Sequence, residues 1–158
     1  MPILASASAG DLNAVKPSPL TSSEQYALMS LWCLLPAPLF VSGDLSHLDP
    51  SALGVLCNPE VIEVDQDSLG KPARVVDLDE DRFLMIKELE DGSRAVGLCN
   101  RGEIAMEATA KWSDLGVSGQ QIVRDLWREK DLGISDQQFT ALVPRHGVAL
   151  LKFTGKRK

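Results

Sequence analysis

The segment from Tyr26 to Leu35 constrains the fold most, because it predicts a helix with almost no polar side. Thr21 and Glu24 precede it as a T-x-x-E capping box, which satisfies the first backbone N–H groups of a helix. Within the segment only Ser30 is polar, so the helix must be buried on more than one face. Pro36 then ends it.

The residues after this helix predict an α/β unit with a parallel sheet. Leu39–Asp44 is a short apolar run between proline and glycine, which is typical of a buried strand. Asp49 and Asn58 each stand before a proline and predict two helix starts, with the first helix ending near Cys57. One strand and short helices cannot cover the apolar first helix, so we expect its surface to need a further partner.

After Gly70 the period of the apolar residues changes to two. In Ile104–Trp112 apolar and polar residues alternate, which predicts an antiparallel strand with one face in water. Asp91-Gly92 predicts a hairpin turn. Residues 71–158 therefore predict an all-β sandwich or barrel. Its further strands are expected at Arg74–Asp79, Arg82–Glu90, Arg94–Asn100, Ile122–Trp127, Phe139–Val143 and Val148–Phe153.

Charge and composition argue against several classes of protein. The 16 Lys and Arg against 22 Asp and Glu give a formal net charge of −6, so we expect no nucleic-acid partner. The most apolar stretch, 27–41, is shorter than a membrane span and holds two prolines, so we expect no membrane segment. Residues 1–20 are predicted to be loose and carry no signal peptide.

The three cysteines, Cys33, Cys57 and Cys99, lack the spacing of a metal site. We therefore expect three reduced core residues, no metal and no cofactor.

Asp65 and Asp67 raise the question of a catalytic pair. A retaining glycosidase holds its two carboxyl groups about 5–5.5 Å apart on opposite sides of the scissile bond. Side chains two residues apart on one extended segment point the same way, so we interpret both aspartates as turn residues that bind backbone. Asp44 follows the predicted strand and is the one candidate substrate-binding residue, although a loop aspartate after glycine is more often a turn former.

The other chemistry-bearing residues have structural interpretations. His47 and His146 are lone histidines, and His146 is expected in a turn before the last strand. Trp112 and Trp127 could form a platform for a sugar, but strand aromatics are more often core residues. Asp77–Arg82 lacks the spacing of a calcium loop and predicts a solvated hairpin turn.

A series of motifs runs in a fixed order from Leu20 to Phe153. The first half carries S-L-W at 30–32, A-P-L at 37–39, G-D-L at 43–45, N-P-E-V-I at 58–62 and Q-D-S-L-G-K at 66–71. The second half carries DGSRAVGLCNRGE, WSDLGV, VRDLWREKDLG and VPRHGVALLKF. This series resembles the C-terminal part of α-galactosidases of glycoside hydrolase family 27, the melibiases.

The resemblance implies a mixed fold: a short α/β remnant of a (β/α)8 barrel, followed by an all-β antiparallel sandwich. The barrel part, its last helix, strand and helix, would occupy 21–70, and the sandwich 71–158. The family hydrolyses terminal α-galactosyl residues by a retaining double displacement. Its two catalytic aspartates follow the fourth and sixth barrel strands, upstream of anything matched here. We therefore assign no catalytic residue in this chain and expect it to be inactive alone.

Two alternatives stay open. The chain could be a non-enzymatic carbohydrate-binding or assembly module in which the sandwich is the working part. It could also be a partner chain that completes a split barrel. In either case the exposed barrel helix would serve self-association or a partner chain, and an α-galactoside would bind only in the intact enzyme. Full-length relatives are often secreted or lysosomal, whereas this sequence indicates no compartment.

Overall fold

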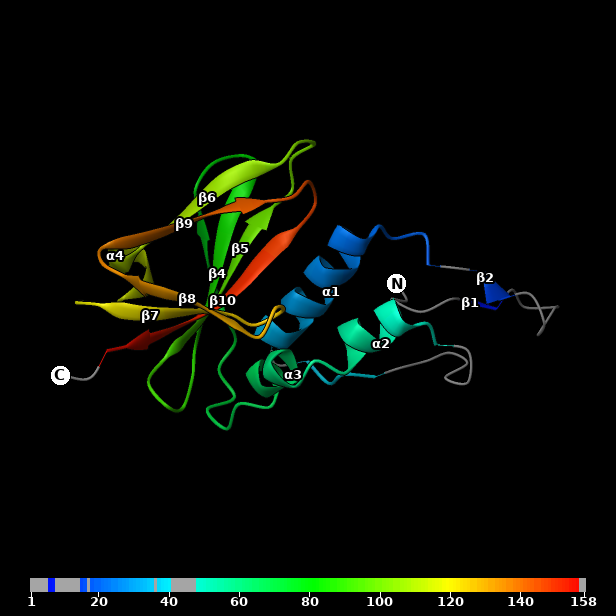
Figure 1. Cartoon of the computed structure of the whole chain (residues 1–158), viewed down its shortest axis with the longest axis horizontal. Helices are drawn as coiled ribbons and strands as arrows, with labels where there is room; N and C mark the ends of the chain where they lie inside the picture. The colour runs from blue at the N-terminus through cyan, green and yellow to red at the C-terminus, as the bar shows by residue number, and fades with distance from the viewer. Residues whose placement is uncertain (1–5, 8–14, 17, 36, 41–47, 157–158) are drawn as a thin grey trace.

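The computed structural model of the chain describes residues 6–7, 15–16, 18–35, 37–40 and 48–156. A helical end and a strand-rich end lie side by side along its long axis (Figure 1). Within the segment expected to be loose, the two-residue strands β1 (Ser6–Ala7) and β2 (Val15–Lys16) pair antiparallel.

The helices begin where the capping signals predict. Thr21 Oγ1 accepts the N–H of Glu24 while the Glu24 carboxylate accepts the N–H of Thr21, so the capping box is complete. Asp49 and Asn58 each accept a backbone N–H from the first turn that follows, at 2.8 and 3.0 Å. The three helices with these caps are α1 (Ser22–Leu34), α2 (Pro50–Leu56) and α3 (Pro59–Asp65).

Apart from the β1–β2 pair, the strands form two antiparallel sheets. The larger sheet has six strands in the order β3-β4-β5-β10-β7-β8, and the smaller sheet pairs β6 with β9. A short helix, α4 (Trp112–Leu115), follows β6 directly. The strand bounds are β3 Arg74–Asp77, β4 Arg82–Glu88, β5 Arg94–Asn100, β6 Met106–Lys111, β7 Gln121–Asp125, β8 Lys130–Ser135, β9 Gln138–Val143 and β10 Val148–Gly155.

The central strands of the large sheet, β4, β5 and β10, are buried on both faces, which produces three layers. One face packs against α1 and α3 in a core that includes Met29, Leu34, Met85 and Leu150. The other face packs against β6 and β9 in a second core. Consecutive residues of β4 and β5 alternate between the two cores, so both strands read as nearly continuous apolar runs. The helices thus lie on the sandwich and not on a sheet of their own.

The structure corrects three sequence predictions. Residues 37–40 form no strand and Phe40 is 81% exposed, while 41–44 lie outside the described residues. Every strand pair in the described part of the chain is antiparallel, so the parallel sheet that would bury Leu39–Asp44 is not found there. Ile104 lies before β6 and is exposed, although Ala108, Ala110 and Trp112 are buried as the alternation predicts. Cys57 is exposed, whereas Cys33 and Cys99 are buried.

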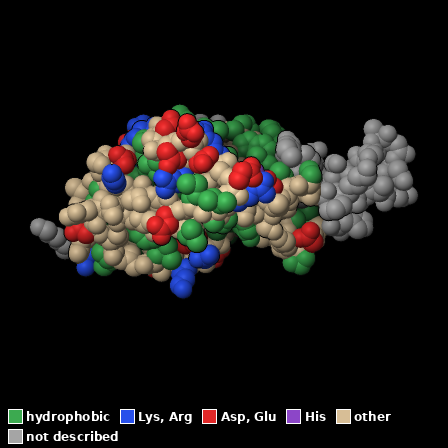
Figure 2. All heavy atoms as spheres, turned by 90° about the horizontal axis from the view of Figure 1, so that it is seen from above, with side chains coloured by type: hydrophobic (Ala, Val, Ile, Leu, Met, Phe, Trp, Pro, Cys, Tyr) green, Lys and Arg blue, Asp and Glu red, His purple; other side chains and the backbone are tan. Residues whose placement is uncertain are grey.

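The apolar helix α1 is covered on one side and open on the other. Met29, Cys33 and Leu34 are buried against the large sheet. Leu28 and Leu31 pack at the margin of the same core and are half-buried, and they line a hollow of about 220 Å³ that opens to solvent, together with Leu20 and Ala27. The space-filling view shows hydrophobic side chains exposed at this helical end, beside the grey residues (Figure 2).

Candidate functional site

Asp44, the one predicted substrate-binding residue, lies outside the described residues, as does His47. Asp67 has the turn role that the sequence predicts. Its Oδ1 accepts the N–H of Leu69 at 3.1 Å, and its carboxylate also accepts the N–H of Glu90 in the hairpin between β4 and β5, at 3.0 Å from Oδ2. Asp65 differs from the prediction, because it is the last residue of α3 and accepts a hydrogen bond from the side-chain amide of Gln66, not from backbone. Asp67 therefore fixes the connection from α3 to the sandwich.

The two tryptophans do not form a shared platform for a sugar. Trp112 is buried between the sheets, edge-on to Phe153 with ring centroids 5.6 Å apart. Trp127 is half-buried and lies edge-on to Tyr26 of α1 with ring centroids 4.6 Å apart. Its indole N–H donates to Ser30 Oγ at 2.8 Å. Trp127 therefore joins α1 to the sandwich.

Lys87 is the central polar residue of the contact between the helices and the large sheet. It lies on β4, is fully buried, and donates from Nζ to two backbone carbonyls, Cys33 O at 3.1 Å and Val64 O at 2.5 Å. These carbonyls belong to the last turns of α1 and α3, which have no basic residue of their own. One ammonium thus satisfies the negative ends of two helices. Burial lowers the pKa of this ammonium, an effect that the charges of Asp65 and Asp67 oppose.

Asn58 makes a second polar link between the layers. Its Oδ1 caps α3, while its Nδ2 donates to the carbonyl of Leu126, 68 residues further along the chain, at 3.1 Å. Next to it, Arg124 of β7 binds both carboxylate oxygens of Glu60, at 2.8 and 2.5 Å. The backbone N–H of Ala73 also donates to Leu34 O at 2.9 Å. We call Ser30, Asn58, Glu60, Lys87, Arg124 and Trp127 the interlayer contacts.

The interlayer contacts were not found by sequence reasoning. The sequence offers one signal for them. Lys87 alternates with the apolar residues Met85 and Leu89, so it shares their face of the strand, whereas a lysine is expected on a face in water. The helix ends that receive its hydrogen bonds are 54 and 23 residues away in sequence, and no local pattern indicates such a pairing.

A groove of about 630 Å³ lies between α1 and the strands β8, β9 and β10. Its walls are mainly apolar, with Leu132, Phe139 and Leu142 among them. Tyr26 and Trp127 also line it, and Asp125 and Arg128, which form an ion pair at 3.7 Å, supply its charged groups. The volume falls in the range of small-molecule sites, but the described side chains present no nucleophile with an adjacent base there.

No group of three or more His, Cys, Asp or Glu side chains in the described ranges could hold a metal ion. Burial raises the pKa of the Cys33 and Cys99 thiols to about 12, so neither is a reactive thiolate at neutral pH. None of the helices that the structure describes has the length and apolar character that a membrane crossing requires.

Comparison with known proteins finds two family models, one for each part of the chain. The model described as "Alpha galactosidase A" matches residues 9–67, and the model described as "Alpha galactosidase C-terminal beta sandwich domain" matches residues 79–153. Among curated proteins, alpha-galactosidase 2 of Arabidopsis thaliana is 33% identical over 140 residues, which are 87% of this chain and 35% of that protein. The alpha-galactosidase of Coffea arabica is 34% identical over 80% of this chain and 34% of its own length.

Solved structures agree with the sequence matches. Alpha-galactosidase I from Mortierella vinacea superposes with a TM-score of 0.82 and 34% identity, over 85% of this chain and 36% of that one. A GH27 β-L-arabinopyranosidase from Geobacillus stearothermophilus, in complex with arabinose, superposes with a TM-score of 0.85 and 28% identity, over 93% of this chain and 34% of that one. The chain spans about a third of the length of these relatives. By sequence and fold, it belongs to the α-galactosidase (melibiase) family, of which it corresponds to the C-terminal portion: a short barrel remnant and the β-sandwich.

Proposed function

We propose that this chain is the structural C-terminal part of a retaining α-galactosidase, in which the sandwich holds the last barrel helices in place. The observation that carries the proposal is the set of interlayer contacts. The sandwich supplies Lys87 to the ends of α1 and α3, and Arg124 and Trp127 to their sides. Substrate turnover would need catalytic carboxylates from the rest of a barrel, because the family resemblance assigns none to the described residues.

The open side of α1 supports a role for this chain against further barrel elements. Leu28 and Leu31 line the hollow. Two more leucines are exposed on the helices: Leu35, which caps the end of α1, and Leu53 of α2. Further barrel elements packed on this side of α1 would cover these apolar side chains. The occupant would be the remainder of a (β/α)8 barrel, either in the same polypeptide or in a separate chain.

A direct test is the hydrolysis of an aryl α-galactoside by this 158-residue chain. We expect no turnover above buffer, because a nucleophile and a general acid each contribute orders of magnitude to the rate. Turnover that disappears in Asp44→Ala or Asp67→Asn would refute the proposal, because it would mean that the chain carries its own catalytic carboxylate.

A chimera tests the scaffold role positively. Residues 18–158 would replace the matched portion of the Mortierella vinacea enzyme, and the chimera should hydrolyse the aryl α-galactoside. The same chimera with Lys87→Met should lose activity at a lower temperature than the parent chimera. A folded, soluble chimera without activity would show that this chain cannot support the catalytic barrel.

A further inference from the structure

Strand β9 has one edge without a strand beside it. The small sheet holds two strands, so β9 pairs with β6 on one side only. Just before β9 begins, Trp112 N donates to Gln137 O at 2.8 Å, in the same register as the β6–β9 pairs. Hydrogen-bonded and non-hydrogen-bonded pairs alternate along an antiparallel ladder, so every second residue from Gln137 onward bonds to β6. The backbone N–H and C=O groups of Thr140 and Leu142 therefore point away from β6.

These four backbone groups open onto the groove of about 630 Å³ that lies between α1 and the strands β8, β9 and β10. Thr140 and Leu142 both line that groove, and none of the four groups has a hydrogen-bond partner among the described residues. An edge strand with unpaired N–H and C=O groups is a template for another extended chain. The edge of β9 is thus complementary to a peptide in β conformation.

A second strand edge faces the same groove. Gly147 O accepts the N–H of Asn100 of β5 at 3.1 Å, so the N–H and C=O of the next residue, Val148, point to the opposite side of β10. The register between β7 and β10 covers only Leu151–Gly155 of β10, so β7 does not reach Val148. Val148 lines the groove and adds a further pair of backbone groups to it.

The walls of the groove suit a strand with apolar side chains at alternate positions. Phe139 of β9 is half-buried there, and Leu132 of β8 is 40% exposed. Leu142, on the outer face of β9, is 68% exposed. The two charged lining residues, Asp125 and Arg128, form an ion pair with each other at 3.7 Å. The groove therefore favours a neutral, apolar segment.

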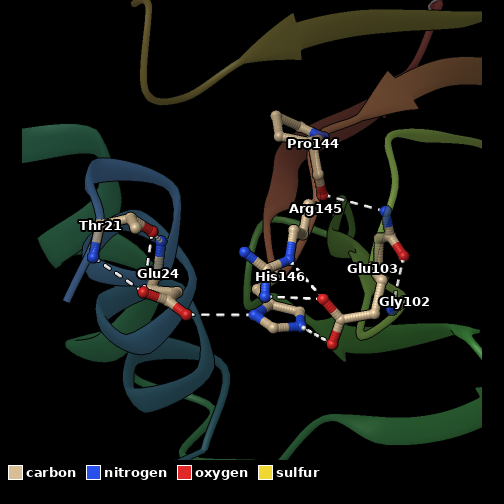
Figure 3. Close-up of polar contacts among 8 residues, drawn as sticks. Thr21, Glu24, Gly102, Glu103, Pro144, Arg145 and His146 are labelled. Atoms are coloured by element: carbon tan, nitrogen blue, oxygen red, sulfur yellow. Dashed lines mark hydrogen bonds and ion pairs between the residues drawn. The ribbon is translucent and has the colours of Figure 1, made fainter.

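Contacts of the turn Pro144–Gly147, which joins β9 to β10, fix one end of the groove. His146 Nδ1 lies 3.1 Å from Glu24 Oε1 at the start of α1, and His146 Nε2 lies 3.3 Å from Glu103 Oε1 (Figure 3). Arg145 Nε donates to Glu103 Oε2 at 2.7 Å. These contacts tie α1, which forms one wall, to the turn that ends β9. A peptide would therefore enter a preformed site, which lowers the entropic cost of binding.

We propose that this groove binds an extended peptide segment of a partner protein, which adds to the edge of β9 as a third strand of the small sheet. The backbone of the segment would bond to Thr140 and Leu142, and every second side chain would pack toward Phe139. A second copy of this chain fits the edge less well, because each copy would bring its own α1 and β8 against the same walls of the other. The proposal concerns the chain itself and does not depend on the proposed function.

The probe is a fluorescein-labelled hexapeptide of alternating threonine and valine, whose binding to the 158-residue chain is followed by fluorescence anisotropy. With the valines packed toward Phe139, the threonine N–H groups donate to the edge of β9. Methylation of the threonine amides should weaken binding roughly tenfold, because it removes the donors to Thr140 and Leu142. Methylation of the valine amides is the matched control and should weaken binding less.

A pair of variants tests the same edge from the side of the chain. Thr140→Pro removes the outward N–H and leaves the β6 side of the ladder intact, so it should weaken binding of the hexapeptide roughly tenfold. Thr140→Val is the matched control and should bind as the wild type does. Both substitutions remove the contact of the Thr140 hydroxyl with Thr109 at 2.8 Å, but only proline removes the edge N–H. Circular dichroism establishes that each variant is folded.

Hydrogen exchange of the wild type gives a readout that needs no variant. Bound hexapeptide should slow exchange of the Thr140 and Leu142 amides, while the Phe139 and Ala141 amides, which already bond to β6, should change little. The proposal is overturned if millimolar hexapeptide does not bind, if both methylated peptides bind equally well, or if the Thr140 and Leu142 amides exchange as fast with bound peptide as without it. Self-association of the free chain that Thr140→Pro abolishes would also overturn it, because a second copy would then occupy the edge.

Discussion

Lys87→Met removes one charge and two buried hydrogen bonds while keeping most of the side-chain volume. Each hydrogen bond from a charged donor contributes about 1.5–3 kcal/mol, and the carbonyls of Cys33 and Val64 would be left buried without this donor. Removing the ammonium also removes its desolvation cost, which offsets part of the loss. We expect a net decrease in the free energy of unfolding of about 2–4 kcal/mol, which lowers the melting temperature on the order of 10 °C.

Lys152→Met is the matched control for this substitution. Lys152 pairs with Ala95 from the β10 side, as Lys87 does from the β4 side, but its partner is the exposed carboxylate of Asp91 at 2.9 Å. A partly exposed ion pair contributes about 0–1 kcal/mol. Urea unfolding followed by circular dichroism would compare the two variants. If Lys87→Met costs no more than Lys152→Met, Lys87 does not bind the two helix ends in the way that its contacts indicate.

The pH dependence gives Lys87 a second signature. Burial lowers the pKa of its ammonium in the folded chain below the ordinary 10.5. The unfolded chain therefore binds more protons in this range, and the stability due to this residue rises as the pH approaches 10.5. The difference in stability between the wild type and Lys87→Met should grow from pH 8 to pH 10. A constant difference would mean that the ammonium is not held in a buried environment.

Substitutions at three further positions have defined outcomes. Gly97→Ala should destabilise the chain by about 1–3 kcal/mol in urea unfolding, because the added Cβ would lie 2.8 Å from Cδ1 of the fully buried Leu34. Asn58→Ala should cost about 2–4 kcal/mol, since it removes a helix cap and the donor to Leu126 O, while Asn58→Asp should cost less because it keeps the cap. The Glu24 carboxylate, with its pKa lowered to about 2, stabilises the folded chain above pH 4.5 and loses this effect as the pH falls toward 2. Circular dichroism over that range should therefore show a smaller acid-induced loss in Glu24→Gln than in the wild type.

The sequence predicts local structure well where a short pattern determines it. The caps at Thr21, Asp49 and Asn58 start helices where expected, and the alternation after Gly70 correctly indicates antiparallel strands. Strand β8 was not predicted, because it is an exposed edge strand with a bulge near Gly133 and lacks an alternating apolar face.

The contacts between the layers could not be predicted from sequence, since they join residues that no short pattern relates. Lys87 lies in an apolar run, and nothing nearby shows that two helix ends cover it. His146 was correctly expected in a turn, but its two carboxylate partners come from distant segments. Asp44, the predicted site residue, stays a prediction because it lies outside the described residues.

The long reach of the interlayer contacts has a consequence for synthesis on the ribosome. Helix α1 emerges before the sandwich, because Trp127 follows its partner Ser30 by 97 residues. His146, which also contacts the helix, follows its partner Glu24 by 122 residues. At about 5–20 residues per second, the apolar side of α1 waits roughly 5–24 s for the strands that bury it. A nascent helix exposed for that time is a substrate for chaperones that bind apolar segments. Helix α1 can pack fully against the large sheet only after β10, the last strand, has been synthesised. We therefore expect the yield of folded chain in cells to depend on chaperone supply more steeply than its equilibrium stability would suggest.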